Sequence, residues 1–414
     1  MSKISLKHSG GKVVSLNSPT AEPNANEVAF KLPNADGSDG QALVTDGSGN
    51  LSFGSVAATR NLIINGAMNV AQRGTSHTGG GYGTVDRWKI DASNLSTGSA
   101  IPKSQQSLSS SDTPYTLGFR KFARLALPAA GSPSANSYAE FQQKIEAQNI
   151  SNSGWNYNST SSFITLQFWF RCSTNQTFYG WVKSTDGTNK RYTFSFTASG
   201  NNAWTKVTKT IPGASGIQID DDIGEGFNVV IAPFYGTDYT GSVSLDTWVT
   251  SNDATHSPDY ASTWLTAGAS TFDLTGVQLE VGSSSTDFQF RSFAEELALC
   301  QRYFETSHSY GVYPFTDDSK GRFIQSSSSN GAGNCMQFIC YATPKRAPAT
   351  ITGAPCVSGN TTLGEWGYGR SGAGGTSSVT FDESGTSGFR AYNGVGANHV
   401  VCDTYGHWKA EAEL

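Results

Sequence analysis

The sequence has few charged residues and no long hydrophobic run, and each scarcity excludes a class of protein. Charged residues make up 15% of the 414 residues, the net charge is -5, and no run of Lys or Arg exceeds two. A nucleic-acid-binding surface needs a concentrated basic patch, so we expect no nucleic-acid partner. Residues 1–17 contain no apolar signal core, and no stretch approaches the length of a membrane span. We therefore expect neither a secretion signal nor membrane insertion.

Cysteine is also scarce, and its spacing is irregular. A disulfide-stapled domain is small and dense in cysteine, which does not describe this chain. The pattern predicts reduced thiols in a protein made in a cytosol. The six cysteines are Cys172, Cys300, Cys335, Cys340, Cys356 and Cys402.

Glycine and aromatic residues, in contrast, are abundant. The chain has 46 Gly, and 12% of its residues are Phe, Trp or Tyr. Strands favour aromatic and β-branched residues and turns need glycine, so this composition predicts an all-β protein. The aromatic content also argues against disorder. A length of 414 residues suits two or three domains.

Residues 1–58 differ from the rest because they hold few large apolar residues. Strand-like pieces at 28–32, 41–45 and 50–53 alternate with turn clusters. Asp-Gly-Ser-Gly at 46–49 is a hairpin signal between two of them. A segment of this kind cannot build its own core, so we interpret it as an extended N-terminal attachment segment.

Residues 59–291 show the alternating pattern of an antiparallel β-sandwich. Many short strand-like runs are separated by turns without helical patterns between them. We predict a strand at 61–70, a hairpin around Asp186-Gly187 and, overall, a jelly roll of about eight strands. The clearest alternation places five residues on one strand face: Ile164, Leu166, Phe168, Phe170 and Cys172.

The end of this domain changes from strand spacing to helix spacing. Apolar residues in 272–281 slip by one position at Thr275-Gly276, which predicts a β-bulge. Ser292 and Glu295 form an S-x-x-E capping box, so we predict a short connecting helix at 292–306. Two interpretations of its apolar seam stay open, since it could pack on its own sandwich or on two neighbouring copies. The seam residues are Phe293, Leu297, Cys300 and Phe304.

Residues 307–414 have a third character. Strand-like runs alternate with long Gly/Ser-rich stretches, and no repeat of solenoid or propeller period is present. We predict a small C-terminal β-domain.

Several motifs resemble parts of tailed-bacteriophage tail fibres. "NLIINGAMNVAQRGTS", followed by "TVDRW", is similar to the start of a jelly-roll module of such fibres. "LTGVQLEVGSSSTDFQFRSFAEELALCQRYFE" is similar to that module's closing strand and helix. "KLPNADGSDGQALVTDGSGNLSFG" resembles fibre stalk segments, and "TPKRAPATITG" with "KAEAEL" resembles the small domain that often follows. The stretch from about residue 90 to 270 carries no specific resemblance.

The resemblance implies a homotrimeric fibre or receptor-binding protein of a virion tail. We expect it to be non-enzymatic and to be assembled in the host cytoplasm. Residues 1–58 would attach to a tail protein, and the distal part would recognise a host-surface receptor. Because the family's jelly rolls are similar to carbohydrate-binding modules, the receptor is expected to be a glycan. Alternatives are a glycan-cleaving tailspike depolymerase and a purely structural tail or head adaptor. No cofactor is expected.

A glycan site needs exposed aromatic rings that stack on sugars and polar groups that bind hydroxyls. "LGEWGYGRSG" carries Trp366, Tyr368 and Arg370 in an apparent glycine-rich loop, although Trp366 could equally pack under that loop. "SGWNYNSTSS" carries Trp155 and Tyr157, for which a core role is the stronger interpretation. These five residues are the predicted binding candidates.

Catalytic and metal-binding patterns are weak. The densest acidic cluster holds Asp220, Asp221, Asp222 and Glu225, and a solvated turn explains it better than a cation site. Asp317-Asp318 is a weaker acidic pair, and His399, Cys402 and His407 match no zinc spacing. No G-x-S-x-G nucleophile motif occurs. We expect no catalytic residues and no metal.

Overall fold

The structure is a computed structural model, and its chain divides into two compact units, residues 1–59 and 60–414. Each unit is described by itself. The described residues are 3–7, 9–17, 31–34, 36, 41–45, 50–55, 61–198, 202–261, 263–312, 314, 323–328, 334–354, 362–370, 373–394 and 401–414.

The first unit contains two β-hairpins. Strand β1 (Lys3–Lys7) pairs with β2 (Val13–Asn17), and β3 (Gln41–Thr45) pairs with β4 (Leu51–Ser55). The second hairpin confirms the strands predicted on either side of 46–49, although these four turn residues themselves lie outside the described part. Most of the predicted strand at 28–32 also lies outside it.

Large apolar side chains of this unit are exposed. Leu43 and Val44 of β3, Phe53 of β4 and the nearby Leu32 all reach the surface. Two-stranded hairpins with exposed apolar residues are marginally stable alone, which agrees with the expectation that this segment lacks a core of its own.

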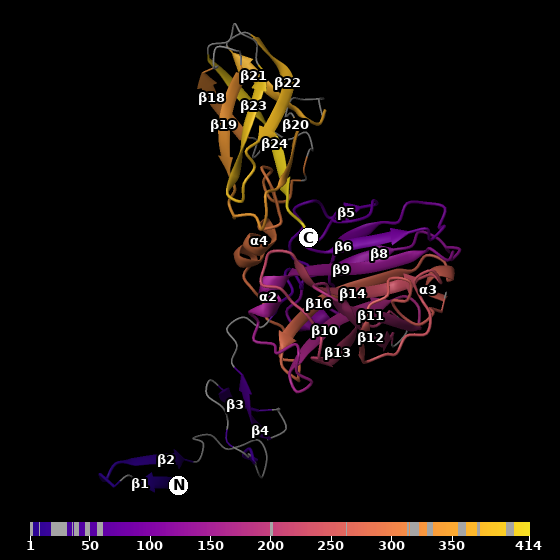
Figure 1. Cartoon of the computed structure of the whole chain (residues 1–414), viewed down its shortest axis with the longest axis vertical. Helices are drawn as coiled ribbons and strands as arrows, with labels where there is room; N and C mark the ends of the chain where they lie inside the picture. Colours follow the sequence, from indigo (N-terminus) through magenta and orange to yellow (C-terminus); the bar gives the residue numbers. More distant parts are fainter. Residues whose placement is uncertain are drawn as a thin grey trace. The chain divides into compact units, whose positions relative to one another are not determined.

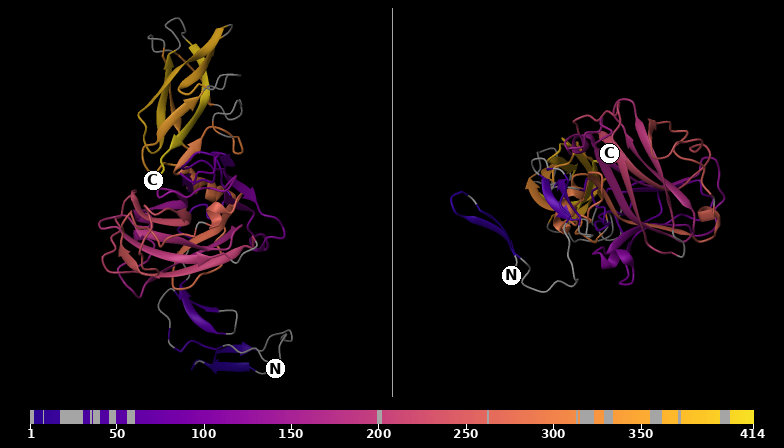
Figure 2. Two further views of the ribbon diagram at one scale, coloured as in Figure 1. Left: turned by 90° about the vertical axis from the view of Figure 1, so that its right-hand side faces the viewer. Right: turned by 90° about the horizontal axis from the view of Figure 1, so that it is seen from below.

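Residues 61–291 fold into two six-stranded antiparallel sheets, confirming the predicted sandwich (Figures 1 and 2). The first sheet has the order β13-β10-β16-β8-β7-β5, with bounds β5 Ser76–His77, β7 Lys103–Ser107, β8 Lys121–Ala126, β10 Phe163–Cys172, β13 Thr205–Pro212 and β16 Thr271–Val281. The second has the order β15-β12-β11-β14-β9-β6, with bounds β6 Lys89–Ser93, β9 Tyr138–Glu146, β11 Thr177–Ser184, β12 Lys190–Thr197, β14 Glu225–Tyr235 and β15 Trp248–Thr250.

The sandwich encloses one large apolar core between the sheets. The five alternating residues predicted for one face of β10 are all buried in it, so that strand prediction is confirmed. Gly187, at φ 60°, lies between β11 and β12 as the turn pattern predicted. Helices α1 (Thr113–Thr116), α2 (Ala147–Ser151) and α3 (Thr263–Thr266) are short connectors.

The predicted bulge in β16 is confirmed. Gln167 of β10 pairs with Gln278 and Trp169 pairs with Thr275, so β16 holds one extra residue between these pairs. Gly276 takes φ 63° there, a left-handed conformation in which any Cβ would be strained. The sequence signal was the one-residue phase slip of the apolar residues.

The predicted strand at 61–70 is wrong, because this segment is irregular. Asn65 and Met68 have positive φ values of 57° and 59°, which no strand accommodates. The Asn65 side chain accepts from the N–H of Val70 (3.0 Å) and donates to its carbonyl (2.9 Å), replacing ladder hydrogen bonds. Met68 and Val70 are buried as expected, but by a folded-back loop.

The predicted capping box starts helix α4 (Phe293–Gln301). Ser292 Oγ accepts from Glu295 N (3.3 Å), and Glu295 Oε2 accepts from Ser292 N (2.8 Å). The helix is shorter than predicted, because Phe304 belongs instead to strand β17 (Phe304–Thr306) and pairs with β24. None of the helices in the described ranges is long and apolar enough to cross a membrane.

The C-terminal part is an eight-stranded antiparallel sheet system built around the long strand β24 (Figure 1). With β17, its strands are β18 Phe323–Ser328, β19 Asn334–Cys340, β20 Thr350–Ala354, β21 Glu365–Arg370, β22 Ala373–Asp382, β23 Gly388–Gly394 and β24 Val401–Glu411. The prediction of reduced thiols is wrong for Cys335, which is disulfide-bonded. Cys172, Cys300 and Cys340 are free.

Buried ion pairs join the sandwich to the segments around the C-terminal strands. Arg302 donates twice to Glu146 of β9, at 2.7 Å each, and the Tyr303 hydroxyl donates to the same carboxylate at 2.5 Å. Glu413 pairs with Arg73 (3.0 Å) and with Arg87. The Glu146 carboxylate is fully buried, so removal of Arg302 would leave its charge uncompensated.

Candidate functional site

The structure does not place Trp366 where a sugar could stack on it. The residue lies in strand β21, not in a loop, and its side chain is fully buried. Its Nε1 donates to the His407 carbonyl (3.0 Å), and its ring packs edge-on against Phe381 (5.7 Å). The expectation of an exposed Trp366 is therefore wrong. Tyr368 of the same strand is half-buried, and the Arg370 side chain lies outside the described residues.

Trp155 is likewise a core residue. Its ring is buried and packs edge-on against Phe227 at 5.8 Å. Tyr157 is half-buried, and its hydroxyl donates to the Ile219 carbonyl (3.4 Å). The interpretation that favoured core packing for this pair agrees with the structure.

The predicted helix seam is split between interior and surface. Cys300 and Phe304 are buried within the chain, and the Arg73 guanidinium lies over the Phe304 ring at 3.7 Å. Leu297 is half-buried, whereas Phe293 is 47% exposed. The four residues therefore do not form one continuous contact face.

The acidic cluster stabilises a turn through its own hydrogen bonds. Asp221 accepts from Asn152 Nδ2 (2.7 Å) and Ser151 Oγ (3.2 Å), and Asp222 accepts from Gly224 N (2.8 Å). These hydrogen bonds agree with the interpretation of the acidic cluster as a solvated turn.

No group of three or more His, Cys, Asp or Glu side chains suited to a metal occurs within the described ranges. His407 is buried and stacks on His308 at 3.5 Å. Its predicted neighbours His399 and Cys402, and the pair Asp317-Asp318, have side chains outside the described residues.

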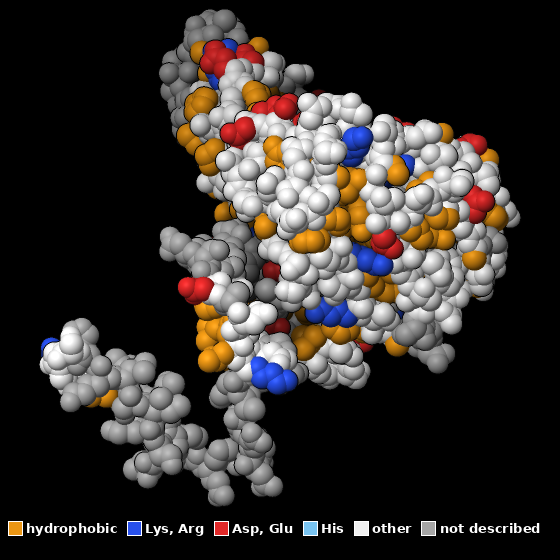
Figure 3. Space-filling view, turned by 60° about the horizontal axis from the view of Figure 1, so that its bottom comes forward, with side chains coloured by type: hydrophobic (Ala, Val, Ile, Leu, Met, Phe, Trp, Pro, Cys, Tyr) orange, Lys and Arg blue, Asp and Glu red, His pale blue; other side chains and the backbone are white. Residues whose placement is uncertain are grey.

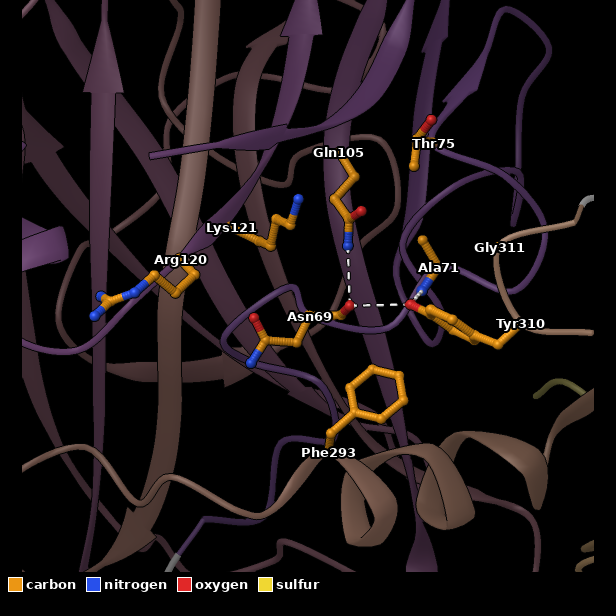
Figure 4. A pocket seen from close by; sticks show the side chains of 9 residues that line it. All are labelled: Asn69, Ala71, Thr75, Gln105, Arg120, Lys121, Phe293, Tyr310 and Gly311. Atoms are coloured by element: carbon orange, nitrogen blue, oxygen red, sulfur yellow. Dashed lines mark hydrogen bonds between the residues drawn. The ribbon is translucent and has the colours of Figure 1, made fainter. Parts of the chain in front are cut away.

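A surface hollow of about 330 Å³ lies beside the first turn of α4 (Figure 4). Its volume is at the lower end of the range of small-molecule sites. Its residues come from the irregular 61–75 segment, from β7, from the start of β8 and the residue before it, from α4 and from the stretch after β17. They are Asn69, Ala71, Thr75, Gln105, Arg120, Lys121, Phe293, Tyr310 and Gly311.

Two half-exposed aromatic rings form one wall of this hollow. Phe293 and Tyr310 are 47% and 48% exposed and meet edge-to-face at 5.0 Å. The Tyr310 hydroxyl accepts from Ala71 N (3.2 Å) and donates to the Asn69 carbonyl (3.2 Å), which fixes its ring. The Tyr310 ring is thus held in place while about half of each side chain remains exposed.

Polar groups lie next to these rings (Figure 4). Gln105 Nε2 donates to the carbonyls of Met68 (2.7 Å) and Asn69 (3.1 Å), so its Oε1 is left as an acceptor. The Asn69 amide makes no side-chain hydrogen bond to any described residue. Lys121 Nζ donates to Ser107 Oγ (3.0 Å) and retains further N–H groups. An apolar wall with donors and acceptors beside it is suited to a polar ligand with apolar faces.

A second, smaller hollow of about 260 Å³ lies between residues 133–135 and residues from the range 234–260. Its carboxylate, Asp259, already accepts from Thr240 Oγ1 at 2.5 Å, and its Tyr260 hydroxyl donates to the Ala232 carbonyl (3.2 Å). Because its main polar groups are satisfied within the chain, this hollow is the weaker candidate.

Sequence reasoning missed most of this site. Phe293 was identified only as a seam residue, and Asn69, Gln105 and Tyr310 were not singled out. The one usable signal was Tyr310-Gly311, an aromatic residue followed by glycine outside any strand pattern. The remaining residues meet only through the fold.

Neither a protein-family model nor a curated protein sequence matches the chain. Among solved structures, the chain is similar to the enzymatically active domain of tailspike protein 4 of bacteriophage CBA120, with 10% identity and a TM-score of 0.29 over 56% of this chain and 23% of that one. It is similar to TmCBM61, solved with β-1,4-galactotriose, with 8% identity and a TM-score of 0.27 over 55% of this chain and 100% of that one.

It is also similar to the CBM22-1 xylan-binding domain of Paenibacillus barcinonensis Xyn10C, with 8% identity and a TM-score of 0.26 over 55% of this chain and 100% of that one. The chain thus spans about a quarter of the tailspike structure and the full length of the two smaller modules. These likenesses assign the chain no function.

Proposed function

We propose that this chain is a non-enzymatic glycan-binding protein and that the hollow beside Phe293 is its binding site. The observation that carries the proposal is the pairing of two fixed, half-exposed rings with unsatisfied polar groups. A pyranose has an apolar face that covers aromatic carbon and hydroxyls that bind amides. Phe293 and Tyr310 supply the rings, and Asn69, Gln105 and Lys121 supply the hydrogen-bonding groups.

The lining of the hollow supports binding without cleavage. Glycoside hydrolysis uses two carboxyl groups that flank the scissile bond. None of the nine residues that line this hollow is Asp or Glu. A sugar bound here would meet no acid–base pair, which favours a binding role over the depolymerase alternative.

The biological setting proposed is the tail of a bacteriophage, where the chain forms a homotrimeric fibre that recognises a host-surface glycan. The resemblance of its motifs to tail fibres supports this setting. Residues 1–58 would attach to a tail protein, and the exposed Leu43, Val44 and Phe53 are apolar groups that such a partner could cover. Three copies of one weak site on each fibre would raise avidity without a tight single contact.

Two measurements test this proposal. The purified chain should bind bacterial surface polysaccharides on a glycan array, and N69A should weaken that binding. N156A is the control, because Asn156 is an exposed asparagine that lies outside the hollow. Equal binding by the two variants would move the site elsewhere. The mass of the intact oligomer should be that of a trimer, and a stable monomer would contradict the fibre assignment.

A further inference from the structure

The hollow beside Phe293 carries positive charge in a protein whose net charge is negative. Lys121 and Arg120 both line it, and no carboxylate does. Most described arginines, in contrast, are paired with carboxylates. The paired arginines are Arg73, Arg87, Arg124, Arg171, Arg291, Arg302 and Arg390.

Lys121 is positioned by its strand and by one hydroxyl. It pairs with Ser107 across β7 and β8, and its Nζ donates to Ser107 Oγ at 3.0 Å. Its own carbonyl accepts from Thr275 Oγ1 (2.7 Å), which anchors the backbone at this point. No carboxylate forms an ion pair with Lys121 anywhere in the described part of the chain. Its charge is therefore available to a ligand.

Arg120 lies at the rim, with its side chain turned outward from the two rings (Figure 4). Its Nη1 donates to the carbonyls of Tyr115 (3.0 Å) and Phe119 (2.7 Å), and its guanidinium carbon lies 4.0 Å from the Tyr115 ring centre. Within the described residues, its Nε and Nη2 have no acceptor. The guanidinium is thus held in one place with donors left over.

Neighbouring carboxylates are already neutralised by other cations. Asp112 pairs with Arg171 (3.1 Å), and Asp273 pairs with both Arg124 (2.7 Å) and Arg171 (2.9 Å). These acids do not cancel the charges of Lys121 and Arg120. Figure 3 shows one face of the molecule, on which both acidic and basic side chains are spread over the surface.

We propose that the ligand of this hollow is an anionic sugar, with its acidic group held by Lys121 and, at the rim, by Arg120. The inference rests on the proposed glycan-binding function and specifies its ligand class. The sugar ring packs on Phe293 and Tyr310. Its negative group forms the ion pair that no carboxylate of the described residues forms with Lys121 or Arg120. A lysine ammonium is a point charge and accepts either a carboxylate or a phosphate.

The experiment compares three probes that differ in one group. They are a hexasaccharide of mannuronic acid, its carboxyl-reduced neutral counterpart, and a mannose oligosaccharide that carries 6-phosphate. Binding to the full-length chain is measured by calorimetry at low and high salt for the unmodified protein, for K121Q and for K206Q. Lys206 is an exposed lysine of β13 outside the hollow, so K206Q is the matched control.

An anionic probe should bind about fivefold to tenfold more tightly than the neutral one, because a charge-assisted hydrogen bond is stronger than a neutral one. K121Q should abolish that preference, K206Q should preserve it, and added salt should reduce it. The probe that binds distinguishes a carboxylate from a phosphate ligand. Equal affinity for charged and neutral probes, or a preference that survives K121Q, would overturn the inference and leave the glycan-binding proposal intact.

Failure of all three probes to bind at millimolar concentration would also overturn the inference. The proposed function is judged separately, by the polysaccharide array and the Asn69 variant. The two proposals can therefore fail independently.

Discussion

Replacement of Phe293 by alanine is the sharpest test of the binding site. The side chain is 47% exposed and forms one wall of the hollow. If a sugar ring packs there, F293A removes the apolar surface that the sugar covers and should weaken glycan binding. Because half of the side chain is already in solvent, stability should change little.

The size of the effect follows from the exposed area. A buried phenylalanine contributes on the order of 200 Å², so about 90 Å² of Phe293 remains open to a ligand. At about 25 cal/mol per Å², complete coverage is worth about 2 kcal/mol, or about thirtyfold in affinity. A sugar that covers one face would use about half of this area, and the expected loss is then about fivefold.

Phe290 provides a matched control. It is also 47% exposed and lies three positions earlier in the chain, but it does not line the hollow. It packs instead against Phe119 (4.9 Å) and Phe288 (4.8 Å). F290A should therefore leave glycan affinity unchanged.

Glycan affinity and thermal unfolding should be measured on both variants. A loss of affinity confined to F293A, with an unfolding temperature close to that of the unmodified chain, would support the reasoning. Equal affinity for F293A and F290A would refute it. An equal loss of glycan affinity in F293A and F290A would indicate a general effect of removing a surface aromatic residue.

Three further predictions concern stability. W366A should destabilise the C-terminal strands by about 3–5 kcal/mol, because it empties a fully buried site, and a change below about 1 kcal/mol in denaturant unfolding would contradict that packing. R302Q should cost about 2 kcal/mol by leaving the buried carboxylate of Glu146 uncompensated. R390Q breaks an equally short but solvent-exposed pair and should change stability much less than R302Q in the same denaturant unfolding experiment. Burial and the neighbouring Arg191 guanidinium lower the pKa of His256 from 6.5 to about 4. Between these two pH values the histidine is protonated in the unfolded chain but neutral in the folded one, so stability should fall as the pH drops from 6.5 toward 4. H256Q should flatten this pH dependence in thermal unfolding, and an unchanged slope would assign it to other groups.

Strand periodicity was a reliable guide wherever side-chain alternation alone decides burial. The alternation in β10 identified its buried face, and the phase slip identified the Gly276 bulge. The capping box located the start of α4 because its two hydrogen bonds join residues three apart. All of these signals are local, so the sequence contains them directly.

The same reasoning failed where distant groups set the conformation. Alternating apolar residues at 61–70 indicated a strand, but the Asn65 side chain folds the segment into a loop. The spacing of Phe304 indicated helix, but its backbone pairs with β24, about a hundred residues later. The glycines around Trp366 indicated a loop, but β22 and β24 flank this strand on both sides.

The sequence by itself determined the all-β class, the sandwich, the connecting helix and the hairpin at the N-terminus, because composition, period and capping act over a few residues. Only the tertiary structure decided the candidate site. Asn69, Gln105, Lys121, Phe293 and Tyr310 come from five separate segments. No local pattern can indicate that they meet, because strand pairing and the packing of α4 bring them together.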